Sequence, residues 1–171
     1  MACELTTGMN AQICRENTGG VIEFYVANFE NVASTTEVSS EITAITMVSG
    51  KKFYTFKPNK NTSTWEQPIQ GSVEAGTIGY EHKANMVFSK NEASDINTLK
   101  LLAKSNLMII VRERSGRYYL LGKTEGLQLS EGGFASGAVL ADANAWTLAF
   151  TGSEPNPAPE VDPAIIAALL A

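Results

Sequence analysis

Apolar and polar residues alternate along most of this chain, which is the pattern of half-buried β-strands. Gly19 and Gly20 precede an apolar and aromatic run over residues 21–29, which predicts a first strand. Residues 41–48 and 52–57 predict a hairpin with a turn at Ser49 and Gly50. The same pattern predicts further strands over residues 65–72, 73–89, 107–111, 118–121, 126–130, 137–140 and 146–152.

Helical periodicity is confined to two segments. Residues 92–104 place Ile96, Leu99 and Ala103 on one face, and Asn91 or Ser94 is expected to cap this helix. Residues 163–171 follow a proline-rich linker and predict a short helix with Asp162 as its cap and Pro163 at its first position. A helix this short is expected to be ordered only if it packs on the rest of the protein.

The chain of 171 residues is long enough for one domain with a hydrophobic core. We predict an N-terminal arm over residues 1–18, a β domain over 19–152, and a linker with an extended C-terminal tail over 153–171. Residues 58–80 contain few aliphatic side chains and many turn formers, so we expect a hairpin or loop that projects from the body. The expected core consists of Val21, Ile22, Phe24, Val26, Leu99, Leu102, Ile109, Val111, Leu121, Leu148 and Phe150.

Charge and composition narrow the classes of function. The chain has 13 basic and 18 acidic residues, a net charge of -5 and a pI of about 4.9, which argues against a protein that clamps nucleic acid through its phosphates. No apolar run reaches the roughly 20 residues that a bilayer requires, and no signal peptide is evident, so we expect no membrane partner. Cys3 and Cys14 are expected to be free thiols, although their spacing leaves a bridge open.

No set of residues predicts catalysis. The single histidine, His82, lies in a segment that predicts an exposed strand, so no base is evident beside a nucleophile. The glycine pairs match no phosphate-binding motif, and Arg112, Arg114 and Arg117 flank a predicted hairpin turn. We therefore expect no enzyme, no catalytic residues, no cofactor and no metal site.

Several segments resemble structural proteins from the tails of tailed bacteriophages, in particular tail tube or tail-ring proteins of phages that infect Bacteroidetes, including crAss-like phages. The resemblance covers most of residues 19–152. It is carried by Gly19-Gly20-Val21 before an aromatic strand, the helix end at 99–106 running into 107–111, residues 116–122, and Gly137 followed by Asp142-Ala143-Asn144 and Trp146-Thr147-Leu148.

The resemblance implies a mainly β fold, a tail-tube-like β-sandwich or small barrel with one packed helix. It also implies hexameric rings that stack into a tail tube or connector conduit for the genome, with one sheet of each subunit lining the channel. The partners would be other copies of the chain, adjacent tail or connector proteins and DNA in passage without specific binding. The protein would be assembled in the host cytoplasm and reside in the virion tail. The alternative is a capsid decoration or baseplate-associated β module without a channel.

Two sets of residues are expected to serve such an assembly. Trp65, Ile69, Val73 and Ile78 in the projecting segment are candidates for contacts between subunits, because they are poor residues to leave in water. A channel for DNA requires small polar or acidic walls, and Glu41, Thr43 and Thr46 are candidates to face it. Burying both Ile42 and Ile45 on the same strand breaks strict alternation, which predicts a bulge near Ala44.

Overall fold

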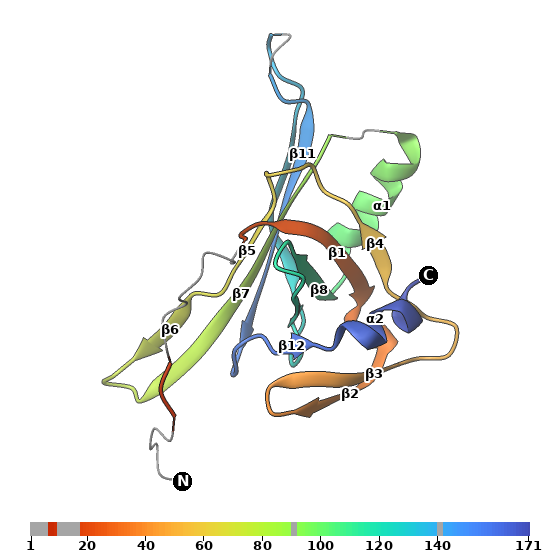
Figure 1. Ribbon diagram of the computed structural model, residues 1–171. Coiled ribbons are helices and arrows are strands. Elements are labelled where there is room, and N and C mark those ends of the chain that lie inside the picture. Colours follow the sequence, from red (N-terminus) through yellow and green to blue (C-terminus); the bar gives the residue numbers. More distant parts are fainter. Residues whose placement is uncertain (1–6, 10–17, 90–91, 140–141) are drawn as a thin grey trace.

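The computed structural model describes residues 7–9, 18–89, 92–139 and 142–171 and shows a mainly β protein with two sheets and two short helices (Figure 1). Neither sheet closes into a barrel. The strands are β1 (Val21–Asn28), β2 (Val32–Val38), β3 (Glu41–Met47), β4 (Tyr54–Phe56), β5 (Thr64–Glu66), β6 (Ile69–Ser72), β7 (Thr77–Phe88), β8 (Leu107–Glu113), β9 (Tyr118–Leu121), β10 (Gln128–Ala135), β11 (Ala145–Glu154) and β12 (Glu160–Val161). The helices are α1 (Ala93–Lys104) and α2 (Pro163–Leu169), and a single 3-10 turn spans Phe29–Asn31.

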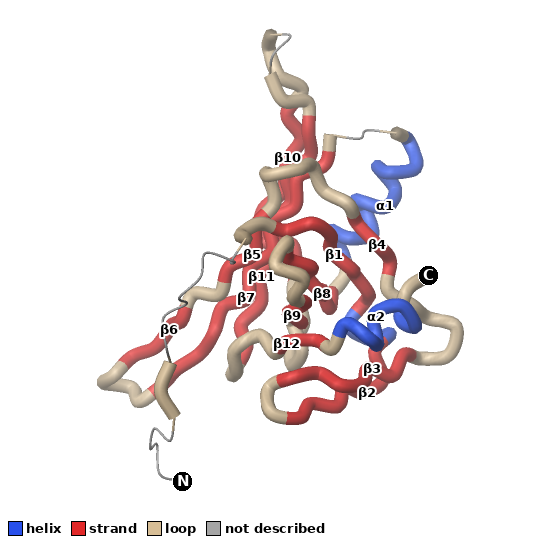
Figure 2. Tube along the Cα trace, in the orientation of Figure 1, coloured by secondary structure: helices blue, strands red, loops and turns tan. Residues whose placement is uncertain are grey.

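The two sheets have different shapes. The seven-stranded sheet has the order β2-β3-β12-β9-β8-β1-β4, and the five-stranded sheet has the order β10-β11-β7-β5, with β6 also paired to β7 (Figure 2). The long strands β7 and β11 pair from Phe88 with Trp146 to Tyr80 with Glu154. Beyond these ends, a hairpin of β6 and β7 and a hairpin of β10 and β11 extend away from the body at opposite ends of the sheet (Figure 1).

A first core fills the space between the sheets. One face of β1, β8 and β9 packs against the inner faces of β7 and β11, and Leu102 of α1 closes one side. Phe24, Ile109 and Phe150 are completely buried there. Nearly all of the core predicted from the sequence is confirmed. Ile22, at 38% exposure, is wrong, because a register shift between Val21 and Glu23 turns its side chain outward. Leu99 of α1 packs against this core but is only partly buried.

A second core lies on the opposite face of the seven-stranded sheet, under α2. Its members include Phe53, Ile110 and Leu120, which are buried, together with Ile166 and Leu169 of α2. The C-terminal segment is therefore part of the globular body, and the prediction of an extended tail is wrong. The linker returns the chain to the sheet because β12 inserts between β3 and β9, with Glu160 opposite Tyr119.

Both helices begin close to the predicted positions. The first turn of α1 is capped by Glu92 in a capping box with Asp95, and not by Ser94, while Asn91 lies outside the described residues. The Asp162 carboxylate accepts a hydrogen bond of 2.8 Å from the Ala164 N–H at the start of α2, as its sequence predicts.

One predicted hairpin is wrong. The strand at residues 54–56 pairs with β1, and β3 pairs with β2 and β12, so residues 41–57 do not form a hairpin. Phe53 explains the difference: its side chain is buried under α2, and its N–H donates to the carbonyl of Leu169 at 2.9 Å, which draws the chain away from β3.

Candidate assembly surfaces

The hairpin of β6 and β7 beyond the body, residues 69–80, is named the arm here. Its register pairs Ile69 with Tyr80 and Gly71 with Ile78, so these residues share one face. Ile69 and Ile78 are 65% and 67% exposed, and Val73 in the turn is fully exposed. The close pairing of the strands requires glycine at position 71, since a Cβ there would lie 2.6 Å from the Thr77 carbonyl oxygen. The arm therefore presents an uncovered apolar face.

Trp65 is separated from the other three residues predicted to join subunits. It is half-buried against the first core, its indole N–H donates to Glu113 Oε1 at 2.7 Å, and its ring lies 4.9 Å from that of Tyr119. Within the predicted projecting segment 58–80, the part up to Glu66 packs on the body, and the arm extends from it.

The arm leaves the body beside two buried polar residues. His82 is 1% exposed, which overturns the prediction of a surface position: Glu81 and Lys83 occupy the outer face of β7, and alternation turns His82 inward. The Gly122 N–H donates to His82 Nδ1 at 3.3 Å. Burial lowers the pKa of His82, although the nearby Glu154 carboxylate and the backbone of Asn156 oppose that change.

The Glu154 carboxylate is buried at the end of β11. It accepts hydrogen bonds from the backbone N–H groups of Thr124 and Glu125 at 2.9 to 3.0 Å, which satisfies its charge without a cation. The turn that supplies these donors fits closely against β11, since a Cβ on Gly152 would clash with the carbonyl of Gly126. The base of the arm is thus held by buried polar contacts, whereas the arm itself is not covered.

The outer face of the five-stranded sheet is mainly polar. One row across the strands consists of Thr64, Asn85, Ala149 and Glu131. The next row consists of Glu66, Lys83, Thr151 and Gln128. The charged residues of these strands on this face are three glutamates, at 66, 81 and 131, and one lysine, Lys83, whose ammonium lies 3.2 Å from Glu81 Oε2.

The candidates for the channel wall lie on another sheet. Glu41, Thr43 and Thr46 are all exposed on β3. The predicted bulge is confirmed, because Thr36 pairs with Ala44 and Glu37 with Ile42, which leaves Thr43 without a partner residue. Ile42 and Ile45 are consequently both buried, at 0% and 9% exposure.

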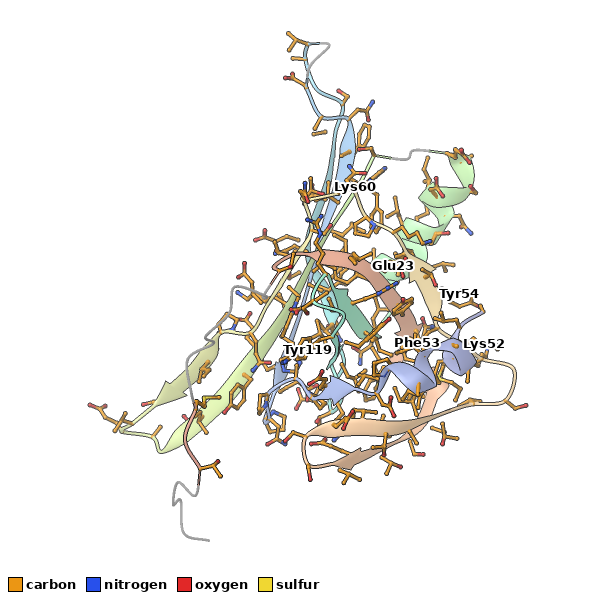
Figure 3. All side chains as sticks on the ribbon, viewed as in Figure 1. Glu23, Lys52, Phe53, Tyr54, Lys60 and Tyr119 are labelled. Carbon is orange, nitrogen blue, oxygen red and sulfur yellow. The ribbon has the colours of Figure 1, made fainter. Side chains whose placement is uncertain are left out.

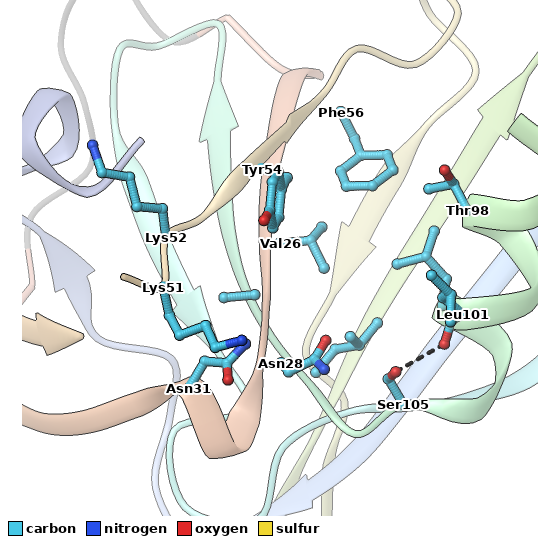
Figure 4. Close-up of a pocket in the computed structure, with 13 residues that line it drawn as sticks. Val26, Asn28, Asn31, Lys51, Lys52, Tyr54, Phe56, Thr98, Leu101 and Ser105 are labelled. Atoms are coloured by element: carbon cyan, nitrogen blue, oxygen red, sulfur yellow. Dashed lines mark hydrogen bonds between the residues drawn. The ribbon is translucent and has the colours of Figure 1, made fainter. Parts of the chain in front are cut away.

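A groove between β4 and α1 was not evident in the sequence. It has a volume of about 470 Å³, and the buried residues that line it include Val26, Leu102 and Leu107. Figure 4 shows Tyr54, Phe56 and Leu101 around it. Tyr54 and Leu101 line it while remaining 60% and 61% exposed. It is formed by residues distant in sequence, and no local pattern could have indicated it.

A polar network spans β1 and β8 near the second core, and no local sequence pattern indicates it. The Tyr25 hydroxyl donates to Glu23 Oε2 at 2.7 Å, Arg112 lies 3.4 Å from the same oxygen, and the Lys57 ammonium lies 3.5 Å from Glu23 Oε1. Burial alone would raise the pKa of Glu23, but the Tyr25 hydroxyl and the two cations hold it below its usual value. Burial and the neighbouring carboxylate raise the pKa of Tyr25. Figure 3 labels Glu23 on β1.

Other classes of site are not found in the described part of the chain. There, no group of three or more histidine, cysteine, aspartate or glutamate side chains could hold a metal ion. None of the helices in these segments has the length and apolar character needed to cross a bilayer. Cys3 and Cys14 lie outside the described residues.

The chain was compared with known proteins at three levels. No protein-family model, no curated protein and no solved structure matches it.

Proposed function

We propose that this protein is a virion structural protein whose copies form rings, and that the rings stack into a tail tube or connector conduit for the genome. The observation that carries the proposal is the outer face of the five-stranded sheet. A surface along which DNA slides must not bind phosphates, and this face offers hydroxyls, amides and methyl groups with an excess of glutamate over lysine. The resemblance of the sequence to tail tube proteins supports assembly into rings. The number of six copies in each ring is also taken from that resemblance.

The edges of this sheet support assembly through strand pairing. β10 has no partner strand on its outer side in the described chain, and β5 and β6 form the opposite edge. Unpaired backbone groups at such edges are templates for pairing with another chain. Pairing of β10 with the opposite edge of a neighbour would join the outer faces into one continuous wall around a channel.

The five-stranded sheet replaces β3 as the favoured wall in this proposal. Glu41, Thr43 and Thr46 satisfy the same chemical requirement, but they belong to a hairpin at the far edge of the other sheet. Their role as lumen residues stays a prediction. The five-stranded sheet presents the required surface over four adjacent strands.

The first experiment is size-exclusion chromatography of the purified full chain, followed by negative-stain electron microscopy. Rings or tubes with a central hole are expected. A monomer at all accessible concentrations would overturn the conduit and favour the decoration or baseplate module.

Cysteine labelling then distinguishes the two walls. Thr147 is exposed on β11, two positions from Ala149 and therefore on the same outer face. Thr147→Cys and Thr43→Cys on β3 are compared in a background without the native cysteines, using a maleimide on a polymer too large to enter the channel. We expect Thr147→Cys to be protected in assembled particles and Thr43→Cys to be labelled. The reverse result would restore β3 as the wall.

A further inference from the structure

The arm carries both an apolar face and one isolated charge. Ile69, Val73 and Ile78 are exposed, while the opposite face of the hairpin carries Gln70 and Thr77. The only charged residue between positions 69 and 80 is Glu74, in the turn at the tip. Glu74 makes no salt bridge with any described residue. A binding site complementary to the arm would have an apolar surface for its isoleucine and valine side chains and a cation for the Glu74 carboxylate.

The groove between β4 and α1 has both properties. Its lining is mainly apolar, and it continues into a second cavity of about 300 Å³ that shares Phe56 and Thr98 and adds Phe88 and Leu99. Tyr54 and Leu101 remain open to solvent beside it. Exposed apolar side chains gathered around a concave surface are typical of a docking site.

The cation is Lys51. Figure 4 shows its ammonium pointing toward Asn31 at one end of the groove, whereas Lys52 points away, and Lys52 Nζ donates to the Leu170 carbonyl at 2.8 Å. No carboxylate of the described residues forms a salt bridge with Lys51. The carboxylate at the arm tip and the ammonium at the groove, neither of which forms a salt bridge among the described residues, are thus complementary.

The arm cannot reach the groove of its own chain. Figure 1 shows the arm at the lower left, whereas β4 and α1, which carry residues that line the groove, lie on the right side of the molecule. A surface and its complement on opposite sides of one molecule produce head-to-tail contacts, which close into rings or continue as filaments. This arrangement identifies a second copy of the chain as the occupant of the groove.

We propose that the arm of one copy docks into the groove between β4 and α1 of the next copy, with its apolar face on Tyr54, Phe56 and Leu101 and with Glu74 beside Lys51. This inference rests on the proposed function, because it assigns a second contact between the assembled copies, in addition to the strand pairing at the edges of the five-stranded sheet. It names a receptor for the arm, which the sequence does not indicate.

A charge-reversal cycle tests the pairing. The variants are Glu74→Lys, Lys51→Glu and the double variant, and the measurement is the midpoint concentration of assembly by sedimentation velocity. Each single variant should raise the midpoint about tenfold or more by placing like charges together, and the double variant should restore it. Glu125→Lys, an exposed glutamate outside the arm and the groove, is the matched control and should leave the midpoint unchanged.

Directed disulfide formation provides the second measurement. In a chain with Cys3 and Cys14 replaced by serine, one population carries Val73→Cys and the other carries Leu101→Cys. Mixing them under mild oxidation should yield a covalent dimer, whereas Val73→Cys with Val38→Cys, a comparably exposed position on β2, should not.

The outcomes separate the two proposals. If the chain assembles but the double variant is not restored and the Val73–Leu101 dimer does not form, the groove is not the receptor and the proposed function stands. If the unaltered chain does not assemble, both proposals are overturned. Thermal melts of each variant ensure that a lost assembly is not a lost fold.

Discussion

The two sheets of this protein are covered to very different extents. The central strands of the seven-stranded sheet are buried on both faces, so that Leu107 to Val111 of β8 are all at most 2% exposed. In the five-stranded sheet, β7 and β11 bury only one face, and the sheet extends beyond the body as the arm at one end and as the hairpin of β10 and β11 at the other. The apolar side chains of the central strands of the seven-stranded sheet are covered by other parts of the same chain. The five-stranded sheet, in contrast, exposes apolar side chains at the arm and backbone groups at its edges.

This difference assigns separate tasks to the two sheets. Burial of apolar area is the main source of folding free energy, so the stability of the monomer should depend on the seven-stranded sheet and its two cores. The ends and edges of the five-stranded sheet contribute little to that stability and are free to bind other copies. Substitutions in the two regions should therefore have different consequences.

The largest effect is expected for two neighbouring residues of β8. Ile109 faces the first core and Ile110 faces the second, and both are essentially fully buried. Ile109→Ala and Ile110→Ala should each lower the free energy of unfolding by about 2–5 kcal/mol, measured by denaturant melts.

The two substitutions also test how much the second core contributes to the free energy of unfolding. If α2 were a loosely docked tail, Ile110→Ala would cost much less than Ile109→Ala. A loss below half of that of Ile109→Ala would show that the second core is minor. Removal of residues 163–171 is a useful comparison. Without α2, Ile110 is less buried, so Ile110→Ala should lower the free energy of unfolding by less than it does in the full chain.

A smaller effect is expected for the network on β1. Tyr25→Phe removes the hydroxyl that donates to Glu23 and leaves a partly buried carboxylate with fewer donors. The free energy of unfolding at neutral pH should fall by about 1.5–3 kcal/mol, because the lost hydrogen bond is to a charged group.

The control for this variant is Tyr54→Phe, on the neighbouring strand β4. Tyr54 is 60% exposed, so its variant should stay within about 0.5 kcal/mol of the parent chain. Equal effects of the two variants would show that the hydroxyl of Tyr25 has no special role.

The sequence predicts best where local pattern and burial agree. The strand at 107–111, the turn after Arg114, both helices and the bulge in β3 follow from alternation, turn residues and caps. His82 was misplaced because a lone histidine among charged residues resembles a surface position, although the alternation with Glu81 and Lys83 already directs it inward.

What the sequence could not reveal depends on contacts between distant segments. Phe53 leaves β3 because α2, more than one hundred residues later, covers it. The groove between β4 and α1 and the network of Glu23 with Arg112 arise from the same kind of long-range packing. Local propensity does not determine such pairings.

The pH dependence of stability tests the boundary between body and arm. His82 is held neutral by burial, and its pKa lies below the ordinary value of 6.5. The unfolded chain takes up this proton more readily, so the stability that is present above pH 6.5 should be lost as the pH falls below it. The contribution of one proton is at most about 1.4 kcal/mol per pH unit.

The variant His82→Gln has no side chain that titrates at this position, so its pH dependence is the reference for that of the parent chain. Between pH 7 and pH 5, unfolding free energies of the parent chain should fall more steeply than those of the variant. Parallel slopes would mean that His82 is not buried in solution, and the base of the arm would then be open.

The smallest effect on folding is expected at the arm. Ile78 lies beyond the last residue of β7 that pairs with β11, and it is 67% exposed. Ile78→Ser should therefore change the free energy of unfolding of the monomer by no more than about 0.5 kcal/mol, measured at a concentration where only monomer is present. The same variant should weaken assembly, since the exposed isoleucine is part of the surface proposed to enter the neighbouring groove. A large loss of monomer stability would instead place Ile78 in a contact with its own chain, and the contrast between a covered sheet that folds and an uncovered sheet that assembles would no longer hold.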